Sequence, residues 1–109
     1  MKKDHKIYLE HILEAINKTE TYVRKLDKND FLKNNLVQDG VVRNIEIIGE
    51  AVKNIPSDFK NRNRSIPWRD IAGMRDRIVH FYFGLDYELV WDTVKKDLPI
   101  LKNEIKKLL

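Results

Sequence analysis

The run from Arg75 to Tyr82 holds the residue types and spacing best suited to chemistry. His80 ionises near neutral pH, so its imidazole can take up or release a proton during a reaction. Asp76 lies four residues earlier, which places both side chains on one face if the segment is helical. In that arrangement the carboxylate would orient the imidazole and favour its protonated form. The pair therefore predicts acid–base chemistry at His80, with Asp76 in support.

Arg75 adds a permanent positive charge to the same segment, but a single helix does not bring it to His80 easily. On an ideal helix, a five-residue separation turns the two side chains about 140° apart and displaces them by about 7.5 Å. A two-fold dimer that faces two copies of the segment across one cleft would bring these groups together. A purely structural role is the alternative, because short Asp–His motifs also arise in packing and capping.

The chain has few other residues of the types that catalysis or cofactor binding uses: it contains no cysteine, four glycines and three histidines. Without cysteine there is no disulfide, thiolate metal site or cysteine nucleophile, and the scattered glycines form no phosphate-binding loop. His5 and His11 lie six residues apart, about 240° around a helix axis, so they do not pair as metal ligands. We therefore expect a reaction that needs neither a metal nor a cofactor.

The length and composition fit one small cytoplasmic domain. The 109 residues can bury a single core, so we expect one domain over residues 1–109. The start of the chain lacks the apolar region of a signal peptide, and no apolar run is long enough to span a membrane. A soluble protein of the cytoplasm is the expectation.

The net charge of +4 is ordinary as a sum, but the basic residues are concentrated in two places. The first group leads into the Arg75–Tyr82 run and comprises Lys53, Lys60, Arg62, Arg64, Arg69, Arg75 and Arg77. The second group is typical of the solvated face of a terminal helix and comprises Lys95, Lys96, Lys102, Lys106 and Lys107. The first group calls for a further explanation because it adjoins the candidate chemistry.

Apolar residues at three- and four-residue steps predict helices throughout the chain. The first helix is expected over about residues 4–26, followed by a polar break at 27–30 and a short extra helix near residues 30–36. The second helix has the cleanest pattern and ends at Pro56, because proline pushes the preceding residue away from helical angles. Gly49 lies inside this helix, which favours the close approach of another helix.

The second half of the chain predicts two further helices. Residues 57–65 lack periodicity and contain polar and basic side chains, so we expect an exposed loop there. The third helix is expected over about residues 67–81. The last helix contains Pro99, which predicts a kink or break near Asp97. Together these elements predict an all-α fold with four main helices in an up-and-down bundle.

Three segments and one motif of this chain resemble a known family. Arg75, His80 and Tyr82 fit the R-x4-H-x-Y motif of HEPN-domain proteins, specifically of the HepT-like toxins. The similar segments follow the family's order and cover most of the chain: 43–56, its second helix; 66–83, around its active site; and 88–101, its last helix. The resemblance implies a HEPN-like bundle.

The resemblance also implies a metal-independent endoribonuclease that dimerises to assemble its cleft. In such an enzyme the 2′-hydroxyl of RNA attacks the adjacent phosphorus, His80 transfers the proton and Arg75 stabilises the transition-state charge. Asp76 would orient His80. Three further arginines would guide the RNA backbone, although solvated surface charge explains them equally well: Arg62, Arg64 and Arg77.

A place in a type VII-like toxin–antitoxin pair is the remaining implication of the resemblance. The antitoxin is a minimal nucleotidyltransferase (MNT), which in this family transfers AMP to the motif's tyrosine, Tyr82 here. AMP at that position would add bulk and negative charge beside the cleft and so block RNA. The main alternative is a non-catalytic helical dimer that binds the nucleotidyltransferase or a nucleotide. A structural helical subunit is the third.

Overall fold

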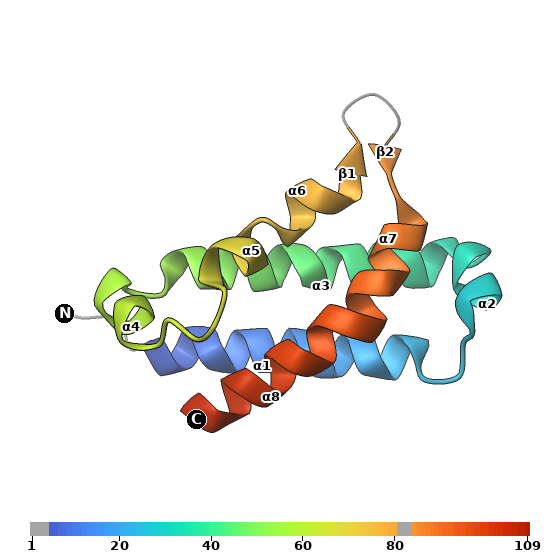
Figure 1. The fold of residues 1–109 in the computed structure, drawn as a ribbon. Helices are drawn as coiled ribbons and strands as arrows, with labels where there is room; N and C mark the ends of the chain where they lie inside the picture. Colours follow the sequence, from blue (N-terminus) through green and yellow to red (C-terminus); the bar gives the residue numbers. More distant parts are fainter. Residues whose placement is uncertain (1–4, 81–83) are drawn as a thin grey trace.

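The computed structural model describes residues 5–80 and 84–109, with the backbone alone for Val79 and His80. In chain order, the elements are α1 (His5–Val23), α2 (Lys28–Leu32), α3 (Asn35–Asn54), α4 (Ser57–Arg62), α5 (Trp68–Ala72), α6 (Met74–Ile78), β1 (Val79–His80), β2 (Gly84–Leu85), α7 (Tyr87–Asp92), the π-helical segment η1 (Thr93–Asp97) and α8 (Leu98–Leu108). Figure 1 shows a helical bundle with a small hairpin at one side. The predicted all-α class is confirmed.

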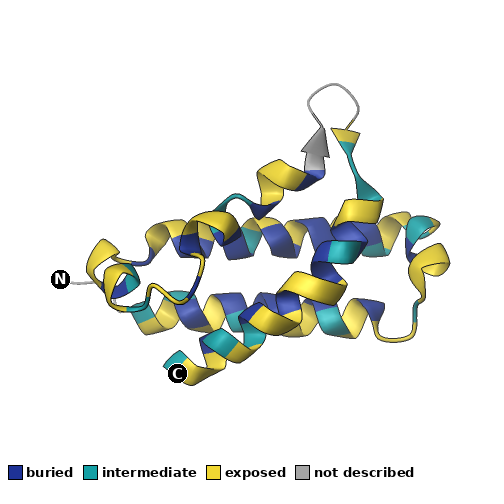
Figure 2. Cartoon of the chain, in the orientation of Figure 1, coloured by how far each residue is buried: buried dark blue, intermediate teal, exposed yellow. Residues whose placement is uncertain are grey.

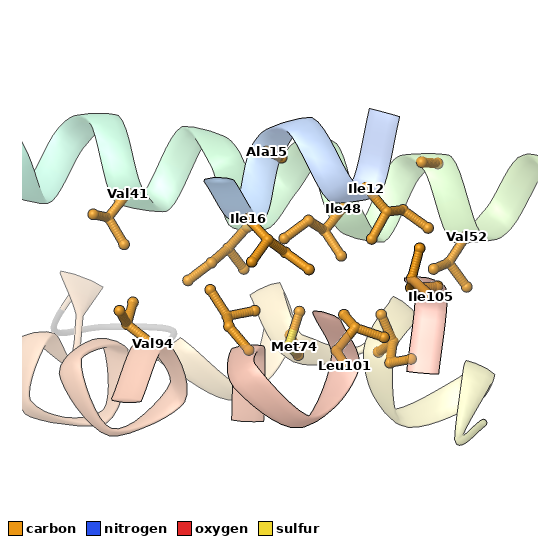
Figure 3. Close-up of a cluster of buried hydrophobic side chains, with 14 of the residues drawn as sticks. Ile12, Ala15, Ile16, Val41, Ile48, Val52, Met74, Val94, Leu101 and Ile105 are labelled. Carbon is orange, nitrogen blue, oxygen red and sulfur yellow. The ribbon is translucent and has the colours of Figure 1, made fainter. Parts of the chain in front are cut away.

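The two longest helices, α1 and α3, form the base of the bundle. They lie side by side, and the α7–η1–α8 arm crosses over them (Figure 1). Helices α5 and α6 pack against α3. Apolar side chains from these helices point toward one another in a single core (Figure 3). Core members at most 6% exposed include Ile12, Ile16, Val41, Ile48, Val52, Met74, Val94, Leu101 and Ile105. Burial of this apolar surface is the main force that holds the helices together.

The first two predicted long helices are confirmed as α1 and α3. Their buried residues face the core and their exposed residues face outward, as the apolar periodicity requires (Figure 2). Helix α3 ends at Asn54, and Ile55 takes extended dihedral angles of φ −70° and ψ 132°. That ending agrees with the restriction that Pro56 places on the residue before it.

The short extra helix near residues 30–36 is present as α2, but it begins earlier than predicted. The expected polar break is in fact its N-terminal cap. The Asp30 N–H donates to Asp27 Oδ1 at 2.8 Å, and the Asp27 N–H donates to Asp30 Oδ2 at 3.2 Å. This reciprocal capping box satisfies backbone donors that would otherwise lack partners, which explains why a polar run starts a helix.

The predicted exposed loop over 57–65 is wrong for its first part, because Ser57–Arg62 forms α4. Phe59 is buried and anchors this short helix, with the His5 ring stacked on it at 4.0 Å between centroids. Trp68 packs against the other side of Phe59, with 6.3 Å between the ring centroids. A helix of six residues contributes one apolar anchor, which is too few for periodicity to reveal it.

The prediction of one continuous third helix over 67–81 is also wrong. Gly73 separates α5 from α6, and the chain leaves the helix after Ile78 to form β1. Strand β1 pairs antiparallel with β2, with His80 opposite Gly84. Gly84 has φ 78°, a left-handed conformation that glycine adopts without strain, and the Asp86 N–H donates to the Ile78 carbonyl at 2.8 Å. The strand pairing and this hydrogen bond stabilise a hairpin where the end of a helix was predicted.

The expected irregularity near Asp97 is confirmed. The π-helical segment η1 ends at Asp97, and α8 starts with Pro99 in its first turn. Proline has no N–H to donate to the carbonyl four residues earlier, so a wider turn accommodates it. Among residues 5–80 and 84–109, no helix is long and apolar enough to cross a membrane.

Candidate active site

Arg75 and Asp76 lie together on the exposed surface of α6. The Arg75 Nη1 donates to Asp76 Oδ1 at 3.4 Å, and the two side chains are 54% and 78% exposed. An ion pair this exposed contributes little to stability, and it occupies one edge of a guanidinium that has further N–H donors for another anion. Asp76 is the hydrogen-bond partner of Arg75 in this structure.

Arg75 faces a groove between α3 and the α5–α6 segment, which we call the Arg75 groove. Its volume is about 470 Å³, within the size range of small-molecule sites. Its lining residues are Arg43, Glu46, Ile47, Gly49, Glu50, Lys53, Ala72, Arg75 and Asp76. Because Gly49 has no side chain, α5 can approach α3 closely along the floor of this groove.

The charges in the Arg75 groove are balanced. Three cations, Arg43, Lys53 and Arg75, share it with the carboxylates of Glu46, Glu50 and Asp76. All six are exposed, so a phosphate that enters the groove meets solvated cations that can reorient toward it. Within the described ranges, 5–80 and 84–109, no group of three or more histidine, cysteine or acidic side chains could hold a metal ion.

Sequence reasoning missed Arg43, and it included Lys53 in the first basic group without assigning it to the site of Arg75. The signal was available, because the four charged residues of α3 in the groove recur at steps of three, four and three: Arg43, Glu46, Glu50 and Lys53. That spacing places them on one helical face. The predicted helix rested on its apolar stripe alone, whereas its polar stripe lines the groove.

His80 belongs to β1, directly after α6, so the helical face that it was predicted to share with Asp76 does not exist. The hairpin projects away from α3 (Figure 1). Its base is anchored by the fully buried Ile78 and by the Asp86–Ile78 hydrogen bond. The His80 side chain and the whole of Tyr82 lie outside the described part of the structure.

The three arginines expected to guide RNA are placed in three different environments. Arg64 lines a second groove, formed by α4, α5 and the connection between them. Arg77 lines a third, between α6 and α8, together with the carboxylates of Asp70, Asp97 and Glu104. Arg62 is the exposed last residue of α4. The structure therefore does not gather them around Arg75.

Comparison with known proteins gives a consistent result across nearly the whole chain. The family model described as "Ribonuclease HepT-like" matches residues 12–108. A relative from Thermococcus cleftensis, named "Probable ribonuclease HepT", is 51% identical over 108 residues, which cover 99% of this chain and 98% of the relative. A relative from Methanocaldococcus jannaschii, named "Gamma-glutamylcyclotransferase and putative RNase", is 50% identical over 109 residues. The chain spans only 49% of that relative's length. No solved structure gave a significant match.

Proposed function

Because the chain belongs to the HepT-like ribonuclease family, we propose that it is a metal-independent endoribonuclease and the toxin of a type VII-like toxin–antitoxin pair. The observation that carries the proposal is the setting of Arg75. Its guanidinium lines an open polar groove, and His80 follows on the strand that continues the same segment. Arginine beside an open groove suits a phosphate, and histidine suits proton transfer.

The proposed reaction uses the RNA's own nucleophile. The 2′-hydroxyl oxygen attacks the adjacent phosphorus while His80 accepts the hydroxyl proton, and the bond from phosphorus to the 5′-oxygen breaks. His80 returns the proton to that 5′-oxygen. Arg75 holds the non-bridging oxygens and stabilises the additional negative charge of the transition state. The products are a 2′,3′-cyclic phosphate and a 5′-hydroxyl.

We assign Asp76 to the positioning of Arg75. The carboxylate accepts a hydrogen bond from the guanidinium at 3.4 Å, and the helical relationship that would have directed it to His80 is absent. An acceptor on one edge of the guanidinium restricts its rotation and turns its remaining donors toward the groove. Asp76 therefore acts through Arg75 in this proposal.

A homodimer completes the proposed site. Arg75 lies in a groove against α3, while His80 is on a hairpin that projects from the bundle (Figure 1). A two-fold partner would place the hairpin of one copy over the groove of the other. Each cleft would then combine Arg75 of one protomer with His80 of its partner.

The proposed antitoxin is a minimal nucleotidyltransferase that transfers AMP to Tyr82. The support is the motif position, two residues beyond His80. An AMP group there would carry a negative charge into the region where the RNA backbone must lie, and would repel it. A cytoplasmic location accords with both proposed partners, the RNA substrate and the nucleotidyltransferase.

A non-catalytic dimer that binds the nucleotidyltransferase or a nucleotide is the second candidate, favoured by the balanced charges of the Arg75 groove. One experiment separates the two functions. The purified chain is incubated with RNA in EDTA, and the products are analysed for a 2′,3′-cyclic phosphate, with His80→Ala and Arg75→Ala as controls. Cleavage by the wild type alone supports the ribonuclease. Cleavage that requires a divalent metal, or that survives in both variants, contradicts it.

A further inference from the structure

A second groove lies next to the Arg75 groove and is more strongly basic. Its volume is about 420 Å³, and we call it the α4–α5 groove. Lys60, Arg64 and Arg69 line it, and Asp70 is the one carboxylate among the lining residues that the structure describes. In the described parts of the chain, none of these three cations takes part in a salt bridge. The described lining residues of this groove therefore carry a net positive charge.

The backbone that carries these cations is held in place by hydrogen bonds. The Asn63 side-chain amide donates to the Phe59 carbonyl at 2.9 Å, and the Trp68 indole N–H donates to the Asn63 carbonyl at 3.0 Å. Ile66 and Trp68 are 2% and 8% exposed, so apolar packing fixes the same connection from beneath. Because the backbone of this wall is already ordered, the ordering cost of anion binding falls on the cation side chains alone.

The two grooves meet at Ala72, which lines both of them. A ligand that follows this surface passes from Arg75 over the short side chain of Ala72 to Arg69 and Arg64. The charge along this path is unevenly distributed. Among the described lining residues, three carboxylates accompany the cations of the Arg75 groove and one accompanies those of the α4–α5 groove. Long-range attraction of a polyanion is therefore concentrated beside the proposed catalytic arginine.

We propose that the α4–α5 groove is a second phosphate-binding subsite, which holds the backbone of a single-stranded RNA whose scissile phosphate lies at Arg75. This inference rests on the proposed ribonuclease function. Cations that contact successive phosphates, with no reading of base edges, give affinity that is independent of sequence and sensitive to salt. The subsite positions the substrate by flanking contacts, and the chemistry remains at Arg75 and His80.

The test measures binding apart from cleavage. A fluorescent 2′-O-methyl oligonucleotide lacks the nucleophile, so its affinity can be followed over a range of salt concentrations without turnover. The slope of log K against log salt is negative, and each lost phosphate contact reduces its magnitude by about 0.7, so Arg64→Ala/Arg69→Ala should reduce the magnitude by about 1.4. The control Lys96→Ala/Lys106→Ala removes the same charge from exposed residues outside both grooves and should keep the wild-type slope. Thermal melts confirm that both variants are folded.

Cleavage kinetics supply the second readout. With a cleavable oligonucleotide, Arg64→Ala/Arg69→Ala should raise KM about tenfold and change kcat much less, because flanking contacts bind substrate and transition state alike. A slope equal to the wild type, or an equal loss in the control variant, overturns the inference while leaving the ribonuclease proposal standing. Wild-type binding to the 2′-O-methyl oligonucleotide without any RNA cleavage contradicts the ribonuclease proposal instead.

Discussion

Gly49 of α3 lies directly beneath the backbone carbonyl of Ala72, at the junction of the two grooves. A Cβ at position 49 would stand 3.3 Å from the Ala72 oxygen, which is closer than most such contacts. The absence of a side chain therefore sets how near α5 comes to α3. Since Ala72 lies between Arg69 and Arg75 in the chain, this contact also helps to set the positions of both arginines.

Gly49→Val should push α5 away from α3. The branched side chain meets backbone that has little room to move, so overpacking should cost about 1–3 kcal/mol of unfolding free energy. Gly49→Ala should be nearly neutral, because a gain of about 1 kcal/mol in helix propensity offsets the tight contact. Chemical denaturation measures both. If Gly49→Val is as stable as the wild type, the close approach is not what this glycine provides.

Helix positions were largely predictable because they follow from local patterns. The apolar stripe of α3 and the restriction from Pro56 are properties of neighbouring residues, and both predictions hold. The interruption at Gly73 and the exit at Ile78 depend on pairing with Gly84, which lies beyond the segment itself. Non-local pairing of that kind leaves no helical periodicity to detect.

The predictions for the candidate site also succeed where a local pattern decides and fail where tertiary packing decides. Arg75 was identified through the R-x4-H-x-Y motif, but the cations that share its groove, Arg43 and Lys53, come from a helix more than twenty residues earlier. Asp76 was assigned to His80 on the assumption of one continuous helix, and the structure gives it Arg75 as a partner. Tertiary packing decides such contacts, and a single sequence does not contain them explicitly.

Asp76→Asn should lower kcat with little effect on stability. The amide keeps the size of the side chain but removes the charge that restrains Arg75, while an exposed pair contributes at most about 1 kcal/mol to folding. A double-mutant cycle with Arg75→Lys tests the coupling: if Asp76 acts through Arg75, the two losses in kcat/KM will not add. Asp76→Glu should recover part of the activity. Additive losses would show that Asp76 acts independently of Arg75.

Co-expression with a minimal nucleotidyltransferase should add AMP to the chain at Tyr82. Mass spectrometry of the intact protein should show additions of AMP mass, and the modified protein should lose RNA cleavage because negative charge then occupies the cleft. Tyr82→Phe should escape both the addition and the inhibition. Addition of AMP to the Tyr82→Phe variant at the wild-type level would place the modified residue elsewhere.

Mixed dimers test whether the cleft combines two protomers. Arg75→Ala and His80→Ala copies, carried on different tags and purified together, form a dimer in which one cleft has both wild-type groups and the other has neither. If Arg75 and His80 act across the two-fold axis, this heterodimer should regain about half of the wild-type activity, although each variant alone is inactive. If both groups act within one protomer, every cleft lacks one of them and the heterodimer stays inactive. A wild-type chain that cleaves RNA as a monomer would contradict the shared cleft directly.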